Sequence, residues 1–140
     1  MNTRSMLALP MVNVIIASSA TSTVNAVTID LANYFPVGKR EVKFVVGCVT
    51  NSTAETVLVT LEQSASSASA ASTVTSGFST ILDYAGSSAA FTSTAAASTG
   101  FEFNGIVTSR YVRAKYNAGQ ATTGSSLAIV VMALPIVRAA

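Results

Sequence analysis

The 140-residue chain contains no histidine, no tryptophan and a single cysteine, Cys48. Without histidine there can be no Ser-His-Asp triad, no histidine general base and no histidine metal ligand. One cysteine can form neither an intramolecular disulfide nor a thiolate zinc site. The six carboxylates are scattered along the chain, and no glycine-rich phosphate-binding motif is present. The sequence therefore predicts no catalytic residues, no metal and no cofactor, and a protein that is not an enzyme.

Charged side chains are also scarce. They make up 10% of the chain, against about a quarter in a typical soluble domain, and half of the residues are apolar. The net charge of +2 is small for a nucleic-acid binder, since binding to the phosphate backbone draws on many lysine and arginine contacts. Large exposed apolar patches are uncommon on proteins that act alone. We therefore expect a protein partner to cover part of the surface, and we expect binding to neither nucleic acid nor a membrane.

Helix-favouring glutamate and lysine are few, whereas serine, threonine, alanine and β-branched residues dominate, which favours strands over helices. Alternating patterns predict strands near residues 27–31, 42–49, 56–64, 78–84, 101–107 and 110–116, with a last apolar run near 127–137. The second and third of these runs flank a turn-like segment, which predicts an antiparallel hairpin. The last run is apolar on both faces, so it is expected to be central in a sheet or covered by a partner. About seven or eight short strands predict an all-β fold, an antiparallel jelly roll or β-sandwich.

The amino-terminal residues 1–26 contain an apolar run, Met6 to Ala17, that resembles the core of a secretory signal peptide. Pro10 and Asn13 interrupt this run, which is also too short to span a bilayer. We favour an extended arm or a first strand that lies on its own domain or on a neighbour. Residues 27–140 are predicted to form a single β-sandwich (jelly-roll) domain.

Three of the eight basic residues lie close together, at Arg110, Arg113 and Lys115, with two tyrosines among them. The alternation turns Val112 and Ala114 toward the core and Arg113 and Lys115 outward. Three interpretations stay open for these cations: a solvated outer face, a surface that meets acidic groups of a protein partner, and a single-stranded nucleic-acid site. The candidate protein-interface residues are these three cations and apolar residues of the terminal segments, namely Leu7, Met11, Val14, Ile15, Ile136 and Val137.

Other residues are interpreted as structural rather than functional. Phe101 and Phe103 could stack on bases or sugars, but their shared strand face favours a place in the core. Cys48 shares a strand face with Phe44 and is expected to be a small core residue. The low-complexity residues 64–76 are expected to form a polar edge loop rather than a disordered linker.

Several stretches occur in an order that is typical of one family. They are STVNAVTIDLA (residues 22–32), VKFVVGCVTNSTAETVLVTLEQSAS (42–66), FSTIL (78–82), SRYVRAKYNAG (109–119) and the closing apolar strand. In this order the chain resembles the jelly-roll capsid cement proteins of short-tailed bacteriophages, over most of its length from about residue 22. The resemblance implies a decoration protein that docks on the outside of the phage head, bridges neighbouring major capsid subunits and does no chemistry.

The same resemblance implies self-association, as a dimer or trimer, and a location on the capsid surface of the virion after synthesis in the host bacterial cytoplasm. An alternative is a carbohydrate- or surface-binding β-sandwich of adhesin type. That alternative predicts a shallow site lined by Tyr34, Tyr84, Phe91 or Tyr116, and the lack of tryptophan counts against it. A nucleic-acid binder that uses the basic strand is a third reading, and it requires binding that falls steeply with salt.

Overall fold

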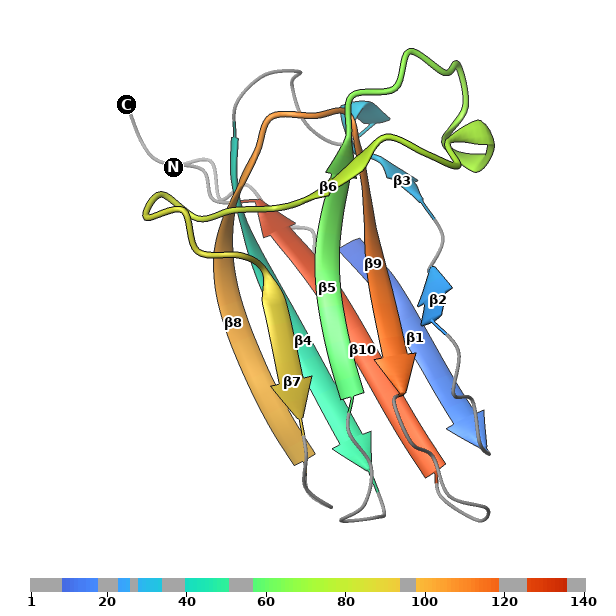
Figure 1. Ribbon diagram of the computed structural model, residues 1–140, viewed down its shortest axis with the longest axis vertical. Helices are drawn as coiled ribbons and strands as arrows, with labels where there is room; N and C mark the ends of the chain where they lie inside the picture. The colour runs from blue at the N-terminus through green and yellow to red at the C-terminus, as the bar shows by residue number, and fades with distance from the viewer. Residues whose placement is uncertain are drawn as a thin grey trace, which may run out of the picture.

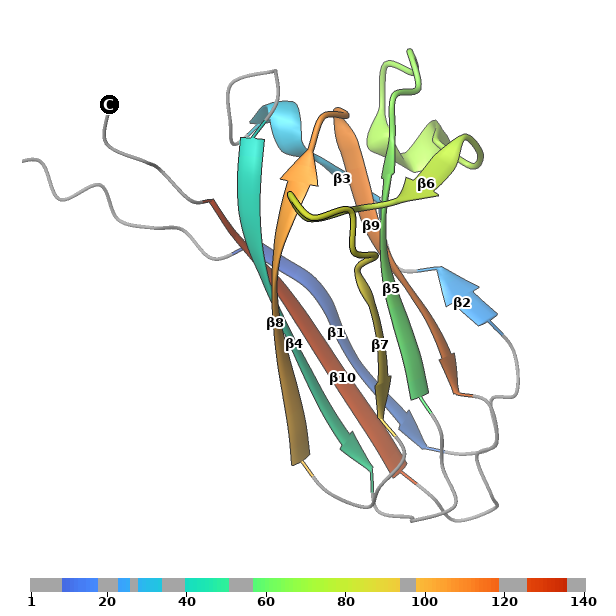
Figure 2. The same ribbon diagram turned by 60° about the vertical axis from the view of Figure 1, so that its left-hand side comes forward.

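The structure is a computed structural model that describes residues 9–17, 23–25, 28–33, 40–50, 57–93, 98–118 and 126–135. In these residues the chain forms strands and two short 3-10 helices, η1 (Leu31–Asn33) and η2 (Ala71–Thr73). The strands form two antiparallel sheets that lie face to face (Figures 1 and 2). The predicted all-β sandwich is confirmed.

One sheet, called sheet A here, has four strands in the order β1-β10-β4-β8. Their bounds are β1 Leu9–Ala17, β10 Ser126–Pro135, β4 Arg40–Thr50 and β8 Ser98–Val107. The closing strand β10 therefore lies between β1 and β4, as a strand that is apolar on both faces was expected to do. Part of the amino-terminal segment, β1, forms an edge of this sheet.

The other sheet, sheet B, has β9 and β5 at its centre, with two short strands along each outer edge. Its strands are β2 Thr23–Asn25, β3 Ile29–Asp30, β5 Val57–Ser64, β6 Phe78–Thr80, β7 Ala90–Ser93 and β9 Tyr111–Ala118. β2 and β3 pair with successive parts of β9, and β7 and β6 pair with successive parts of β5. β2 and β3 together therefore take the place of one interrupted strand beside β9, and β6 and β7 together take the place of another beside β5.

With β2/β3 and β6/β7 each counted as one strand, the chain crosses between the sheets in a regular way. The first, eighth, third and sixth strands form sheet A, and the second, seventh, fourth and fifth form sheet B. This is the strand order of a jelly roll, which is built from two Greek keys. One prediction was wrong. The runs 42–49 and 56–64 form β4 and β5, which lie in opposite sheets and not in a hairpin, because β4 pairs with β10 and β8 while β5 pairs with β9, β6 and β7.

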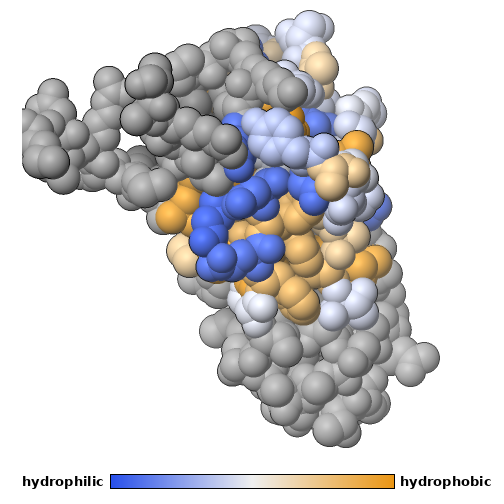
Figure 3. Space-filling view, turned by 90° about the vertical axis from the view of Figure 1, so that its left-hand side faces the viewer, coloured by the Kyte–Doolittle hydropathy of each residue, from blue (hydrophilic) through white to orange (hydrophobic). Residues whose placement is uncertain are grey.

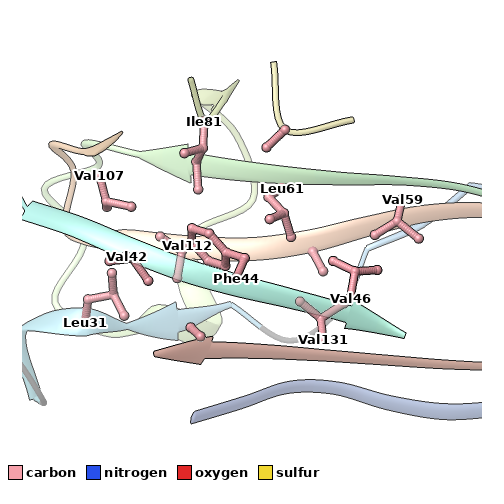
Figure 4. Packing of buried hydrophobic residues seen from close by; sticks show 13 residues of the cluster. Leu31, Val42, Phe44, Val46, Val59, Leu61, Ile81, Val107, Val112 and Val131 are labelled. Carbon is pink, nitrogen blue, oxygen red and sulfur yellow. The ribbon is translucent and has the colours of Figure 1, made fainter. Parts of the chain in front are cut away.

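The core lies between the two sheets, and its side chains alternate along the strands as a half-buried strand requires. The fully buried apolar side chains include Leu31, Val42, Phe44, Val46, Leu61, Ile81, Val107, Val112, Ala114, Val131 and Ala133. Figure 4 shows those of β4 and β10 directed toward those of β5 and β9. The predicted inward positions Val112 and Ala114 are thereby confirmed.

Residues 81 and 82, which follow β6, tie the two sheets together by bridging β5 of sheet B and β8 of sheet A. The amide of Ile81 donates a hydrogen bond to the carbonyl of Leu61 in β5, at 2.9 Å. The amide of Ile106 in β8 donates to the carbonyl of Leu82, at 2.8 Å. Ile81 then packs directly over Gly105 of β8, where a Cβ atom would lie only 2.6 Å from the Ile81 Cγ2 atom. A glycine at residue 105 is therefore required by this close approach.

Candidate interaction surfaces

Arg113 points outward from β9, as predicted, but it is not a solvated side chain. Its Nε donates a hydrogen bond to Oε2 of Glu62 at 2.9 Å, and its Nη2 lies 2.8 Å from the same oxygen. The guanidinium carbon also lies 3.6 Å from the centroid of the Phe78 ring, which is a close cation–π contact. The Arg113 side chain is only 12% exposed. This cation is therefore committed to its own fold, across the β5–β9 pair.

Arg110 is held in a similar way at the start of β9. Its Nε and Nη2 donate to the two carboxylate oxygens of Asp30 in β3, at 2.9 and 2.6 Å. The pKa of the Arg110 guanidinium lies above its ordinary value, chiefly because the Asp30 carboxylate accepts these hydrogen bonds. Asp30 Oδ1 also accepts a hydrogen bond from the amide of Ala32, so the ion pair fixes η1 beside β9.

Lys115 has the loosest ion pair of the three cations. Its Nζ lies 3.7 Å from Oε1 of Glu62, and its side chain, like that of Arg110, is about two-fifths exposed. Three cations and two carboxylates, Asp30 and Glu62, thus leave a local excess of a single positive charge. Such a surface offers few of the phosphate contacts that salt-dependent nucleic-acid binding needs.

The low-complexity stretch is folded onto sheet B as a cover loop, residues 65–77. The Tyr111 hydroxyl donates a hydrogen bond to the carbonyl of Ala68, and Oγ of Ser64 donates to the carbonyl of Ser76 at 3.3 Å. Val74 of the loop and Tyr111 of β9 are both buried. The expected edge loop is present, and it buries the outward side of β9 next to Arg113.

Three phenylalanines gather where β7 and β8 face each other at one side of the sandwich. The Phe91 and Phe101 rings are stacked with centroids 5.3 Å apart, and Phe91 meets Phe103 edge to face at 5.7 Å. All three pack against the core while remaining partly exposed. Figure 3 looks onto this side, where hydrophobic surface borders a hydrophilic ridge. The predicted core-facing role of Phe101 and Phe103 is confirmed, because both rings contact Phe91 and pack against the core.

The outer face of sheet A carries three apolar side chains beside its polar residues Glu41, Lys43, Glu102 and Asn104, whereas a solvated sheet face is usually polar throughout. Val45 of β4 and Met132 of β10 are direct partners in the ladder, and Leu134 lies two residues along from Met132. All three are partly exposed and alternate with buried core residues. Beside them, Gly47 pairs with Gly100 of β8. We use the name outer face of sheet A for these residues together with the other outward residues of β4 and β8, namely Glu41, Lys43, Glu102, Asn104 and Ile106.

Polar groups border this face on the β8 side. The Lys43 Nζ atom lies 2.7 Å from Oε2 of Glu102, and the two side chains are 37% and 66% exposed. A cation and an anion thus stand side by side at the margin of an apolar area. An apolar centre with a polar rim is the usual composition of a protein–protein interface.

A second exposed surface is the Tyr84 turn, residues 82–88, at the end of β8. Oδ1 of Asp83 accepts hydrogen bonds from the amides of Ala85 and Ser87, both at 2.8 Å, and Gly86 has a φ of 83° that suits glycine. On this ordered turn Leu82 and Tyr84 are 43% and 66% exposed. Rigid, exposed aromatic side chains are common anchors in interfaces.

The remaining interface candidates are only partly described. Met11, Val14 and Ile15 belong to the edge strand β1, but their side chains lie outside the described part of the structure. Leu7, Ile136 and Val137 lie outside the described residues altogether, as does Tyr34. The side chains of Cys48 and Tyr116 are likewise not described, although their strands are.

No protein-family model matches the chain, and no curated protein matches it. In the described residues no group of three or more histidine, cysteine, aspartate or glutamate side chains lies together. The same residues contain no helix that is long and apolar enough to cross a membrane. The interaction surfaces are therefore the features from which a function can be argued.

Sequence reasoning missed two parts of these surfaces. The Gly47–Gly100 pair could have been suspected, because a glycine inside a strand pattern often marks a close approach of another backbone. Leu82 lies in a predicted strand and gave no sign that it would be exposed. The carboxylates that pair with Arg110 and Arg113 were also missed, since Asp30 and Glu62 are 80 and 51 residues away in the sequence.

Proposed function

We propose that the protein is a non-enzymatic structural component of a phage virion, a cement or decoration protein on the outside of the head. In this role it binds the major capsid protein and stabilises the contacts between neighbouring subunits. The observation that carries this proposal is that apolar side chains remain at two separate places on the surface: Val45, Met132 and Leu134 are partly exposed on the outer face of sheet A, and Leu82 and Tyr84 are exposed on the Tyr84 turn. A protein that bridges neighbours needs more than one contact surface, whereas a binder of one small ligand needs a single concave site.

Two further observations support this role. The jelly roll is found in capsid proteins as well as in lectins and cupins, so the fold is compatible with the proposal without deciding it. The basic strand, for which a nucleic-acid site was one of three interpretations, carries ion pairs within the chain at Arg110 and Arg113. Binding that favours the assembled shell over its separate subunits would stabilise the shell by mass action, and many copies per particle would add avidity.

We assign the Tyr84 turn to the contact with the capsid. Leu82 and Tyr84 project from a turn that hydrogen bonds already hold, so little conformational entropy is lost on docking. Arg110 and Arg113 contribute mainly to the fold. Lys115 is the cation of β9 that is left to meet an acidic group on a capsid subunit.

The test is attachment to purified virions and to capsids that lack the protein. Wild-type protein should bind DNA-filled heads that lack it, at a fixed number of copies, and raise the temperature at which these heads release their DNA. Leu82→Ser combined with Tyr84→Ala should lower occupancy at least tenfold. Leu58→Ser is the matched control, since Leu58 is equally exposed at 41% but lies on β5. Absence of the protein from virions, or equal occupancy of all variants, would refute the assignment.

The exposed Tyr84 ring also suits the second candidate, a carbohydrate-binding module, because sugar rings pack on aromatic faces. A glycan array measured with wild-type protein and with Tyr84→Ala separates the two functions. Glycan binding that depends on Tyr84, together with no attachment to capsids, would favour the second candidate.

A further inference from the structure

We propose that a hollow beside the Tyr84 turn is a recognition pocket for a carboxamide side chain, asparagine or glutamine, on an exposed loop of the capsid partner. The identity of that partner rests on the proposed function. The pocket itself follows from residues of this chain, and above all from Gln63, whose buried amide has donors that the chain does not use.

An open hollow of about 430 Å³ lies beside the Tyr84 turn. The chain after β6 crosses there from sheet B to β8 (Figure 1). Leu82, Tyr84 and Ile106 supply apolar surface to the hollow, and Gln63, Asp83 and Thr108 supply polar groups. A water molecule takes up about 30 Å³ in the liquid, so the hollow has room for a side chain of another protein.

Of the residues that line the hollow only Gln63 is buried, at 9% exposure, on the inward side of β5 in line with Val59 and Leu61. Its Oε1 atom accepts hydrogen bonds from the amides of Thr108 and Ser109, at 2.9 and 3.1 Å. Two donors on one atom identify it as the oxygen, which leaves Nε2 to the hollow. Among the described residues no acceptor bonds to Nε2, which carries two N–H donors. Buried donors without acceptors are costly, and the acceptor of a ligand removes that cost.

Asp83 supplies the complementary acceptor. Its Oδ1 atom accepts from the amides of Ala85 and Ser87, both at 2.8 Å, and among the described residues no donor bonds to Oδ2. A carboxamide has a carbonyl acceptor and an NH₂ donor, so its oxygen can accept from Gln63 while its nitrogen donates to Asp83. A carboxylate would lack the donor and would be repelled by Asp83, and an ammonium group would lack the acceptor. The two lining groups therefore select a neutral amide.

The order of the lining favours a protein side chain over a sugar. Gln63 is buried, whereas Leu82 and Tyr84 are 43% and 66% exposed and form the mouth of the hollow. Asparagine and glutamine match this order, because an apolar stem carries the amide at its end. A sugar ring, in contrast, has hydroxyl groups all around its edge. The Tyr84 turn is the surface assigned to the capsid, so docking of that turn brings a capsid loop to the hollow.

The first experiment is an NMR titration of full-length, isotope-labelled protein with three capped peptides. The peptides carry asparagine, aspartate or leucine between two glycines, and these three side chains have nearly the same shape. The asparagine peptide should shift the side-chain amide signal of Gln63 and saturate with a Kd of roughly 1–10 mM, which is ordinary for so small a ligand. The aspartate and leucine peptides should bind at least tenfold more weakly. The Gln63 signal is identified by its absence in Gln63→Glu.

Two variants exchange donors and acceptors but keep the hydrogen bonds that hold the fold. Gln63→Glu retains an oxygen for the Thr108 and Ser109 amides and loses both donors, so it should weaken binding of the asparagine peptide at least tenfold. Asp83→Asn retains Oδ1 for the turn amides and places a donor where Oδ2 was, so it should reverse the preference from asparagine to aspartate. A purely structural role would reverse no preference, and the reversal decides the matter even if Gln63→Glu fails to fold.

The second experiment measures attachment to heads that lack the protein, where Gln63→Glu should lower occupancy at least tenfold and Leu58→Ser should leave it unchanged. Peptide selectivity without attachment of the wild-type protein would refute the capsid role and support the pocket. Attachment without peptide selectivity, or with equal occupancy of Gln63→Glu, would refute the pocket and leave the capsid role standing. A Gln63 signal that moves with methyl glucoside and not with the asparagine peptide would overturn the carboxamide and favour the carbohydrate candidate.

Discussion

Replacing Gly105 by alanine tests how the two sheets are joined. Gly105 lies on the inward side of β8, and the added Cβ would lie 2.6 Å from Ile81 Cγ2, 3.0 Å from Phe44 Cε2 and 3.2 Å from Phe103 Cε1. Ile81 and Phe44 are fully buried, so neither can swing away into solvent. The backbone hydrogen bond from Ile81 to β5 also prevents Ile81 from moving as a whole. The substitution must therefore push the two sheets apart locally.

The expected magnitude follows from two opposing effects. Overpacking of a well-packed core by one carbon commonly costs about 1–3 kcal/mol, and the contact distances here place Gly105→Ala near about 2 kcal/mol. Removal of a glycine also restricts the unfolded chain, which returns about 0.5 kcal/mol. The net loss of roughly 1.5 kcal/mol corresponds to a fall in Tm of about 5 °C for a chain of this length.

The assay is thermal unfolding followed by circular dichroism, at a concentration low enough that self-association does not contribute. The matched control is Gly100→Ala in the same strand, where the added Cβ meets nothing within 4 Å. That control should gain about 0.5–1 kcal/mol and raise Tm by roughly 2–3 °C. Equal Tm values for the two variants, or a larger loss for Gly100→Ala, would refute the account of how β8 packs.

Three other predictions concern residues around sheet B and the Tyr84 turn. Arg113→Leu should lower the free energy of unfolding by about 2–3 kcal/mol, because the nearly buried Glu62 carboxylate then keeps only the more distant Lys115 as its cation. Lys115→Met should lower it by less than about 1 kcal/mol, and urea unfolding measures both changes. Tyr111→Phe should cost about 1 kcal/mol and speed cleavage within the cover loop in limited proteolysis, since one of the hydrogen bonds that hold the loop is lost. Asp83→Ala should remove two turn hydrogen bonds and raise amide exchange in the Tyr84 turn at least tenfold, with little change in Tm; unchanged exchange would contradict the ordering role of Asp83.

Strand faces were predictable from the sequence because alternation is a local property. The inward positions of Val112 and Ala114 and the shared face of Phe101 and Phe103 needed only the two-residue period of a strand. For β10 the same reasoning left two alternatives, a central place in a sheet or a place under a partner, and the structure has β10 between β1 and β4.

Strand partners were not predictable, because alternation carries no information about which strands pair. β4 and β5 alternate equally well and are neighbours in sequence, so a hairpin was the simplest inference, but the jelly roll sends the chain into the other sheet. The role of Arg113 was missed for the same reason. Its partner Glu62 is directly opposite on β5, and that register is set only when the sheet forms. The surface character of β9 therefore depended on pairing rather than on local sequence.

Charged residues are few in this chain, and the described ones are used mainly in ion pairs between strands. The described ion pairs join side chains at neighbouring strands, as Lys43 to Glu102 does across β4 and β8, and Arg113 to Glu62 across β5 and β9. Cross-strand pairs of this kind stabilise the chosen register, and each uses charges that would otherwise keep the surface hydrated. With so few charges in the chain, apolar side chains remain on the surface beside the charged ones, as Val45 does beside Lys43 and Tyr84 does beside Asp83. Exposed apolar side chains of this kind favour contacts with other proteins, which agrees with the proposal that the chain acts while bound to a partner.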